Sequence, residues 1–291
     1  MRLLTFMAKD GPRPGALVGE EVIDLRALLP GAAWRDARGM IAAGPQAWAG
    51  VTAALARLGT AARVGPVAEL QLLPPITDPG KLIAIGVNYE DHLRETGHPR
   101  PTSPVVFAKF DTSLNAPGGE IRWDPALTSQ VDWEVELAVV IGQPARRVAA
   151  ADAYEYVFGY TVANDVSARD LQFADRQWVR GKSLDSFCPL GPWIVSRDEI
   201  PDPHGLAIRT LVNDEVVQDA NTDQLVFGVP QLIEYLSAAF TLLPGDIILT
   251  GTPAGVGHYR NPPRYLHDGD RVVVEIESIG RLENVCQEER P

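Results

Sequence analysis

The chain has 291 residues, of which 45% are hydrophobic and 22% are charged, a composition typical of a globular protein with one large domain or two small ones. Its formal net charge of −12 and sequence pI of about 4.9 argue against a nucleic-acid partner, which would need clustered Lys and Arg. Two cysteines, Cys188 and Cys286, are too few for a disulfide framework or a cysteine-ligated zinc site.

The first residues, MRLLTFMAKDG, contain only a short apolar run before Lys9 and Asp10. This run is shorter than the apolar region of a secretory signal peptide. No stretch of the chain approaches the roughly 18 apolar residues that a membrane-spanning helix needs. We therefore expect a cytoplasmic protein with no membrane segment.

Residues 1–73 differ in pattern from the rest of the chain. Short strands are predicted at 1–6 and 20–25, around a GPRPG turn, and the Ala-rich stretch 37–59 favours helix with a break near Gly44. The Pro-rich stretch 72–80 favours extended backbone. We expect a small N-terminal accessory domain over 1–73 and the main domain over 74–291.

The main domain is dominated by short β-branched and aromatic runs bounded by Gly, Pro, Asn or Asp. Strands are predicted at 81–87, 104–110, 135–142, 158–165, 191–196, 206–214, 246–251 and 271–278. Helices are fewer, at 89–96, 167–176 and 229–241. Because strands outnumber helices and do not alternate with them regularly, we expect a β-rich α+β fold rather than a doubly wound parallel sheet.

The stretch VDWEVELAVV has an unusual acidic strand pattern. With a period of two, Asp132, Glu134 and Glu136 share one face, opposite the apolar residues. A solvated surface strand is the simplest interpretation, but the strand becomes continuously apolar directly afterwards, as strands buried on both faces do. The two glutamates lie about 7 Å apart by strand rise, and a divalent cation with oxygen ligands would relieve their repulsion.

A third carboxylate candidate, Asp165, follows the strand FGYTVAN. It could reach back towards the neighbouring strand and complete the site, although a helix N-cap before VSARD is the alternative for this residue alone. Three carboxylates are enough for Mg²⁺, which takes its remaining ligands from water and substrate.

Two other motifs carry groups capable of chemistry. In GVNYEDHLRETG, Asn88 could cap a helix on which His92 and Glu95 are i,i+3 neighbours, so that the carboxylate would orient the imidazole as a general base. An incidental surface pair is the alternative. Lys182, among Gly, Pro and aromatic residues, could be partly desolvated and stabilise an anion, or could be an exposed loop lysine.

The segment DIILTGTPAGVG is a buried strand that runs into a Gly/Pro-rich turn, where a ligand could approach backbone N–H groups and Thr252. The segment lacks the lysine and helix of a phosphate-binding loop, so we do not expect nucleotide binding.

Taken in order, six motifs resemble the fumarylacetoacetate hydrolase superfamily. They are GVNYEDHLRETG, PVVFAKF, DWEVELAVVIG, GYTVANDVSARDLQ, GKSLDSFCPLGPW and GDIILTGTPAGVG. The resemblance covers about residues 75–285, and residues 1–73 look like the variable N-terminal part of the family. It implies a mixed β-sandwich roll, a homodimer and a small-molecule oxo acid as substrate.

The resemblance also implies roles for individual residues. Glu134, Glu136 and Asp165 would bind a divalent metal, Mg²⁺ with Mn²⁺ or Ca²⁺ as alternatives. His92 and Glu95 would form a water-activating dyad, and Lys182 would hold the bound oxo acid. Arg169, Gln172 and Thr252 would contact the substrate. One departure is Phe110, where many relatives have proline, which leaves the distal shape of the pocket open.

These groups predict a metal-dependent hydrolase. In the leading interpretation, His92 activates water, which attacks the 4-oxo carbon of a 2,4-dioxo acid such as an acylpyruvate or a diketo-deoxy sugar acid, and the C–C bond breaks with release of a metal-stabilised pyruvate enolate. The alternatives on the same site are an oxaloacetate-type decarboxylase and a 2-hydroxyhepta-2,4-diene-1,7-dioate-type isomerase. A non-catalytic binding protein is a third possibility, which the presence of all these groups disfavours.

Overall fold

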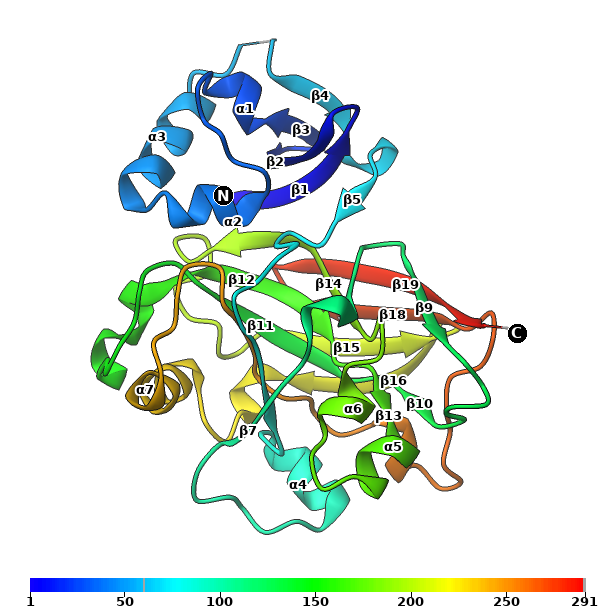
Figure 1. Cartoon of the computed structure of the whole chain (residues 1–291). Helices are drawn as coiled ribbons and strands as arrows, with labels where there is room; N and C mark the ends of the chain where they lie inside the picture. The colour runs from blue at the N-terminus through cyan, green and yellow to red at the C-terminus, as the bar shows by residue number, and fades with distance from the viewer. Residues whose placement is uncertain (60, 290–291) are drawn as a thin grey trace.

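The computed structural model describes residues 1–59 and 61–289 (Figure 1). Its largest element is a twelve-stranded sheet. The main path of this sheet runs β4 (Arg63–Pro66), β3 (Glu21–Asp24), β2 (Gly11–Val18), β1 (Arg2–Ala8), β14 (Cys188–Ser196), β12 (Val157–Asn164), β11 (Val135–Ile141), β17 (Ile247–Leu249), β6 (Leu82–Gly86) and β7 (Val105–Ala108). Off this path, β5 (Leu72–Leu73) pairs with β1, and β8 (Leu114–Asn115) pairs with β14.

A second sheet of five strands packs against the first. Its order is β16 (Glu215–Asn221), β15 (Ala207–Val212), β18 (Arg271–Ile276), β19 (Gly280–Glu288) and β9 (Glu120–Trp123). A two-stranded ribbon joins β10 (Val131–Asp132) to β13 (Ser167–Ala168). Neighbouring strands are antiparallel except in the pairs β17–β6, β14–β8 and β19–β9, among the residues described. The predicted β-rich α+β fold with mixed sheets is therefore confirmed.

The helices are short and lie around the sheets. They are α1 (Leu25–Leu28), α2 (Ala37–Ala42), α3 (Pro45–Leu55), α4 (Glu90–Thr96), α5 (Arg169–Ala174), α6 (Val179–Lys182) and α7 (Val229–Ala239). Short 3₁₀ turns occupy Val67–Glu69, Asp111–Ser113, Ala150–Tyr156, Thr222–Gln224 and Gly257–Tyr259. The three helices predicted for the main domain form as α4, α5 and α7. Within the described part of the chain, no helix combines the length and the apolar character required to cross a membrane.

The N-terminal segment follows the prediction with one correction. The GPRPG sequence is not a turn: it lies inside β2, whose Gly11–Ala8 pairing with β1 places the turn at residues 9–10 instead. Gly44, with φ of 84°, separates α2 from α3 as expected, because a left-handed backbone is accessible to glycine. The GPRPG error arises because Pro is tolerated in extended backbone at positions that need no donor.

The N-terminal segment shares a hydrophobic core with the main domain. β1 extends the large sheet by pairing with β14, with Leu3 opposite Ile194. Leu3, Met40 and Ile41 belong to the same buried cluster as residues from β6, β11 and β17. The predicted domain boundary between residues 73 and 74 falls after β5. This boundary stays a prediction, as does the homodimer.

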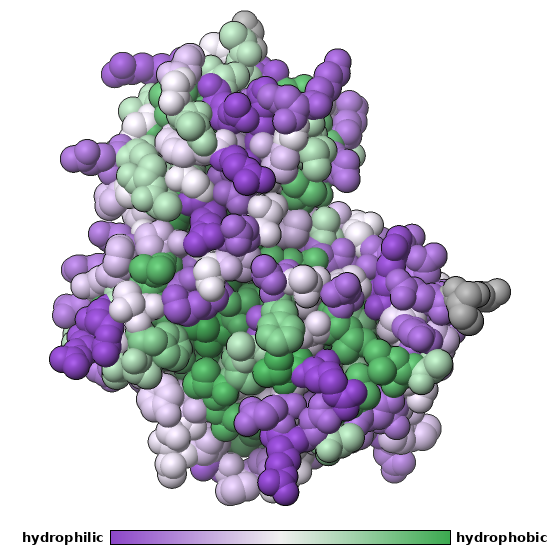
Figure 2. All heavy atoms as spheres, in the orientation of Figure 1, coloured by the Kyte–Doolittle hydropathy of each residue, from purple (hydrophilic) through white to green (hydrophobic). Residues whose placement is uncertain are grey.

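On the face shown in Figure 2, apolar residues gather below the N-terminal segment, around β7 and α6.

Strand β11 lies at the centre of the molecule and is buried along its whole length. Leu137 and Val139 face the second sheet, whereas Ala138 and Val140 face the core shared with the N-terminal segment. Both faces are covered, which explains the continuously apolar AVVI sequence. The acidic residues that precede it are therefore carried into the interior at the end of a buried strand.

Candidate metal centre and active site

Glu134, Glu136 and Asp165 form one buried acidic cluster. One carboxylate oxygen of each residue lies within 4.8 Å of the others. The three residues are between 0% and 6% exposed, so a solvated acidic face is ruled out as the explanation of this strand. The three residues predicted from sequence to meet around a cation are brought together.

The local backbone differs from the single strand that the alternation predicts. The strand is interrupted at Trp133 and Glu134, between β10 and β11. In place of strand pairing, the Glu134 N–H donates to Asn164 Oδ1 at 3.0 Å, and the Asp165 N–H donates to the Glu134 carbonyl at 2.8 Å. This interruption links the first ligand candidate directly to the end of β12. Asp165 is not a helix cap, because α5 begins only at Arg169.

Two buried lysines neutralise part of the acidic cluster. Lys182 is 2% exposed, and its Nζ donates to Glu134 Oε2 at 2.6 Å and to Asp165 Oδ2 at 2.7 Å. Lys109 Nζ donates to the other oxygen, Asp165 Oδ1, at 2.6 Å. The exposed-loop alternative for Lys182 is therefore wrong. Sequence reasoning missed Lys109, whose sole signal is its place directly after the strand PVVFA.

Glu136 is the carboxylate of this cluster without a cation partner among the described residues. Its Oε2 accepts a hydrogen bond of 2.6 Å from the Gly251 N–H. Burial, and then repulsion from Asp165 and Glu134, raise the pKa of Glu136 well above its usual value. Burial acts in the same direction on Glu134, but Lys182 and Arg169 outweigh it and lower the pKa of Glu134 to about 2.

The residues fit a divalent cation. The connected buried groups carry four carboxylates (Asp132, Glu134, Glu136, Asp165) against three cations (Lys109, Arg169, Lys182). The carboxylates therefore exceed the cations by one charge. The carboxylate without a cation partner, Glu136, lies beside the other two candidate ligands, Glu134 and Asp165. Oxygen-only donors suit Mg²⁺, Mn²⁺ or Ca²⁺ rather than zinc.

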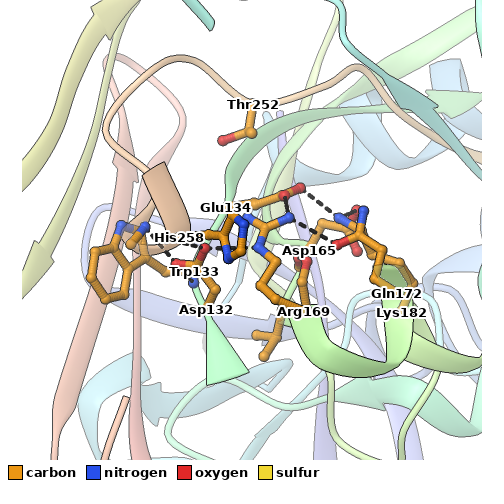
Figure 3. Close-up of polar contacts among 12 residues, drawn as sticks. Asp132, Trp133, Glu134, Asp165, Arg169, Gln172, Lys182, Thr252 and His258 are labelled. Carbon is orange, nitrogen blue, oxygen red and sulfur yellow. Dashed lines mark hydrogen bonds and ion pairs between the residues drawn. The ribbon is translucent and has the colours of Figure 1, made fainter. Parts of the chain in front are cut away.

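Arg169 crosses the site from the start of α5 (Figure 3). Its Nε donates to Asp132 Oδ2 at 2.8 Å, and its Nη1 lies 2.7 Å from Glu134 Oε1. The same Nη1 donates to Gln172 Oε1 at 3.0 Å. The remaining nitrogen, Nη2, is buried and has no hydrogen-bond partner among the residues that the structure describes. A buried guanidinium nitrogen without an acceptor is costly, so this atom marks a place for a ligand oxygen.

Asp132 holds this arginine in place. Its carboxylate accepts hydrogen bonds from the backbone N–H groups of Gly257 at 2.7 Å and His258 at 3.0 Å, in addition to Arg169. The side chain is fully buried. The sequence showed Asp132 as part of the acidic alternation but gave it no separate role.

His92 and Glu95 form the expected dyad on α4. His92 Nδ1 lies 2.7 Å from Glu95 Oε2, and the second oxygen of this carboxylate accepts a hydrogen bond of 2.8 Å from the Gly255 N–H. His92 is 9% exposed, so the incidental surface pair is ruled out. Because Glu95 is an acceptor, the neutral imidazole carries its proton on Nδ1 and leaves Nε2 free to accept one.

Asn88 does not cap α4, contrary to the prediction. The residue before this helix is Tyr89, which makes no capping hydrogen bond through its side chain. Asn88 Nδ2 donates instead to the carbonyls of Thr250 at 2.8 Å and Phe227 at 3.1 Å, and its Oδ1 accepts from the Phe227 N–H. The side chain thus ties the start of the dyad helix to the turn that contacts Glu136.

One pocket is lined by Glu134 and Glu136 of the acidic cluster, by His92 of the dyad and by Arg169. Gln172 and Thr252, both predicted to contact substrate, also line it. Thr252 Oγ1 accepts a hydrogen bond of 2.9 Å from Gln218 Nε2, which leaves its own proton free to donate. Phe110, the departure from proline, is 58% exposed and is not among the residues that line this pocket.

Neither cysteine belongs to the site. Cys188 and Cys286 are both buried and free, and burial raises the pKa of the Cys188 thiol to about 12. Because the thiolate is the reactive form, we expect neither residue to react with a thiol-specific chromogenic disulfide at pH 8 in the folded protein. Both should react after denaturation in urea. Rapid labelling of the native protein would contradict this.

The fold and the site define a metal-dependent enzyme with an all-oxygen ligand set. The family described as fumarylacetoacetate (FAA) hydrolase C-terminal matches residues 81–287, and the chain belongs to this family. An oxaloacetate tautomerase from Bos taurus is 44% identical over 290 residues, covering 98% of this chain and 91% of the bovine protein.

Two solved structures are similar over their whole length. A putative HpcE protein from Mycobacterium smegmatis has a TM-score of 0.88 at 36% identity, with 100% of both chains covered. Maleylpyruvate hydrolase from Sphingobium sp. SYK-6, in complex with manganese(II) and pyruvate, has a TM-score of 0.81 at 34% identity, again with 100% of both chains covered. The acidic cluster and this manganese complex together indicate a divalent-metal site.

The relatives correct one prediction. The tautomerases from Bos taurus and Xenopus laevis are both named as mitochondrial, which contradicts the cytoplasmic location expected from sequence. The reasoning failed because the lack of a secretory apolar region does not bear on mitochondrial import, whose targeting segments are amphipathic rather than continuously apolar.

Proposed function

We propose that this protein interconverts the keto and enol forms of oxaloacetate or of a similarly short 2-oxo dicarboxylic acid. The observation that carries the proposal is that one pocket is lined by Glu134 and Glu136 of the acidic cluster and by Arg169, whose Nη2 has no partner among the described residues. A chelating oxo acid with a second carboxylate matches these two features. The choice of oxaloacetate is supported by the named activity of the bovine relative, which matches nearly the whole chain.

Glu134, Glu136 and Asp165 are the proposed ligands, with Mg²⁺ as the ion and Mn²⁺ or Ca²⁺ as alternatives. When bound, the cation would act as a Lewis acid on the 2-oxo group and make the hydrogens on C3 more acidic. Lys182 Nζ lies 2.6 Å from Glu134 Oε2. Its positive charge would help to stabilise the negative charge that develops on the 2-oxo oxygen of the substrate.

His92 is the proposed base in this reaction. The Nδ1–H of the neutral imidazole donates to Glu95, so Nε2 can take a proton from C3 of the keto form. Return of this proton to the 2-oxo oxygen gives the enol, and the reverse transfer gives the keto form. Arg169 Nη2 and the Thr252 hydroxyl are donors that would orient the substrate carboxylates. Gln172, which accepts from Arg169, fixes the direction of the guanidinium.

Hydrolysis of a 2,4-dioxo acid is the second candidate, and the dyad favours it. His92 Nε2 could instead take a proton from water, whose oxygen then adds to C4. Cleavage of the C3–C4 bond leaves a carboxylic acid and, after C3 is protonated, pyruvate. The similarity to the Sphingobium hydrolase supports this candidate. Decarboxylation of oxaloacetate and isomerisation of an unsaturated dicarboxylate could use the same acidic centre without water.

Three assays on the Mg²⁺- or Mn²⁺-loaded protein separate these reactions. The first follows decay of the ultraviolet absorbance of enol-oxaloacetate, and the others measure pyruvate released from oxaloacetate and from acetylpyruvate with lactate dehydrogenase. We expect faster enol decay without pyruvate release. Pyruvate from acetylpyruvate, with no effect on the enol, would favour hydrolysis, and pyruvate from oxaloacetate would favour decarboxylation.

The dyad is tested in the same assays with His92→Ala. We expect the rate to fall by about 10²- to 10⁴-fold, the usual contribution of a positioned acid–base group. The matched control is His267→Ala, at an exposed position outside the pocket, and it should keep the wild-type rate. A His92→Ala rate equal to that of the control would remove His92 from the mechanism.

A further inference from the structure

The pocket lining combines the charged groups described above with the apolar side chains of Ile85, Val87, Phe107 and Trp178. Phe107 borders the charged part, because Lys182 Nζ lies 5.4 Å from the centroid of its ring. Trp178 packs against Phe107, and these apolar residues form what we call the apolar end of the pocket. Such a wall can limit a substrate by contact but provides no partner for a second carboxylate.

Trp178 is fixed in this wall by two neighbours. Its ring meets Phe107 edge to face, with 5.3 Å between the ring centroids. On its other side it packs on the backbone of Gly86, where a Cβ atom would come within 2.3 Å of the indole carbon Cζ3. A side chain at position 86 would therefore displace the indole. Glycine at this position allows the ring to stand directly against the strand end.

Val87 lines the same pocket and is held in an unfavourable backbone conformation. Its φ is 57°, in the left-handed region that β-branched residues rarely adopt. The next residue, Asn88, is anchored by its side-chain hydrogen bonds to Thr250 and Phe227, and these contacts maintain the conformation. Strain of this kind persists where the surrounding structure enforces it, commonly at functional sites.

We propose that Val87 and Trp178 set the maximum length of the substrate by closing the apolar end of the pocket, so that short 2-oxo acids bind and longer ones are excluded. The proposal rests on the proposed function, since it assumes that an oxo acid binds at the acidic end. It assigns these two residues to specificity rather than to the chemical step.

The test measures binding rather than turnover. Oxamate and N-butyl oxamate are chelating 2-oxo acid analogues that cannot enolise, and they differ in length. Their dissociation constants are measured by calorimetry on the Mn²⁺-loaded protein. In Trp178→Ala we expect N-butyl oxamate to bind at least about 10-fold more tightly than in the wild type, the usual minimum effect of steric room for one methylene. Oxamate binding should change by less than about twofold, because its contacts lie at the charged end.

Val87→Gly provides a second test in a variant that keeps the indole of Trp178, so its result does not depend on whether the Trp178→Ala protein folds. Glycine accepts the left-handed conformation, so the midpoint of thermal unfolding should not fall, while affinity for N-butyl oxamate rises. The aromatic-to-alanine control is Phe110→Ala, outside the pocket, for which both dissociation constants should stay at the wild-type values.

Unchanged or weaker N-butyl oxamate binding in both pocket variants would overturn the proposed length limit while leaving the proposed function intact. Failure of the wild type to bind oxamate would instead overturn the proposed function and, with it, the length limit that assumes it.

Discussion

Glu136→Gln is expected to abolish metal-dependent activity without weakening the metal-free fold. Glutamine can still accept the Gly251 hydrogen bond, but it cannot supply the negative charge that a cation needs. Loss of hydrogen-bonding partners around metal ligands already costs about 10- to 100-fold, so loss of a ligand should exceed about 100-fold. The raised pKa of Glu136 shows that folding disfavours its charged form, so the neutral amide should leave stability in EDTA equal or higher.

The measurement is urea unfolding with and without Mn²⁺. At a metal concentration 100 times its Kd, the wild type should gain about 2.7 kcal/mol. The variant should gain none. Glu120→Gln, the same change at an exposed carboxylate outside the cluster, should behave as wild type in both conditions. A variant stabilised by Mn²⁺ as strongly as the wild type would show that Glu136 is not a ligand.

Lys109→Met is expected to lower the free energy of unfolding by about 3–5 kcal/mol, which is typical when one partner of a buried ion pair is removed. The Lys109 and Asp165 side chains are both 0% exposed, and 2.6 Å separates Nζ from Oδ1. Methionine fills a similar volume, so the loss would come from removing one of the two cations that neutralise the buried Asp165 carboxylate rather than from a cavity. Urea unfolding in EDTA measures the change.

Lys9→Met is the control for this substitution. Lys9 is exposed, so the same change there should shift the free energy of unfolding by no more than about 0.5 kcal/mol. An exposed ion pair contributes at most about 1 kcal/mol. If the free energy of unfolding of Lys109→Met lies within about 1 kcal/mol of the wild-type value, the buried pair does not hold the acidic cluster together.

The acidic cluster could be predicted because its signals are local. The period of two places Glu134 and Glu136 on one face, and the apolar run after them indicates burial. The interruption at Glu134 could not be predicted, because it depends on the side chain of Asn164, 30 residues away in the chain. The ordered motifs supplied the family, and hence Asp165, which local rules would assign to a helix cap.

The missed or misassigned residues are those whose partners are distant in sequence. Lys109 and Asp165 are separated by 56 positions, and no spacing rule joins them. Asn88 stands where a capping residue is expected, but its amide bonds to residues 139 and 162 positions away. In each case a tertiary contact replaced the local preference that sequence reasoning relied on.

The register between β11 and β12 has a consequence for refolding. Val135 pairs with Asn164, so the last ligand candidate, Asp165, follows directly from the register of these two strands. A slip of one residue would turn Glu136 away from Asp165 and into the opposite core. Cation affinity therefore reports whether the central strands have paired correctly, and chains trapped in a wrong alignment should be separable from native ones by their failure to retain manganese.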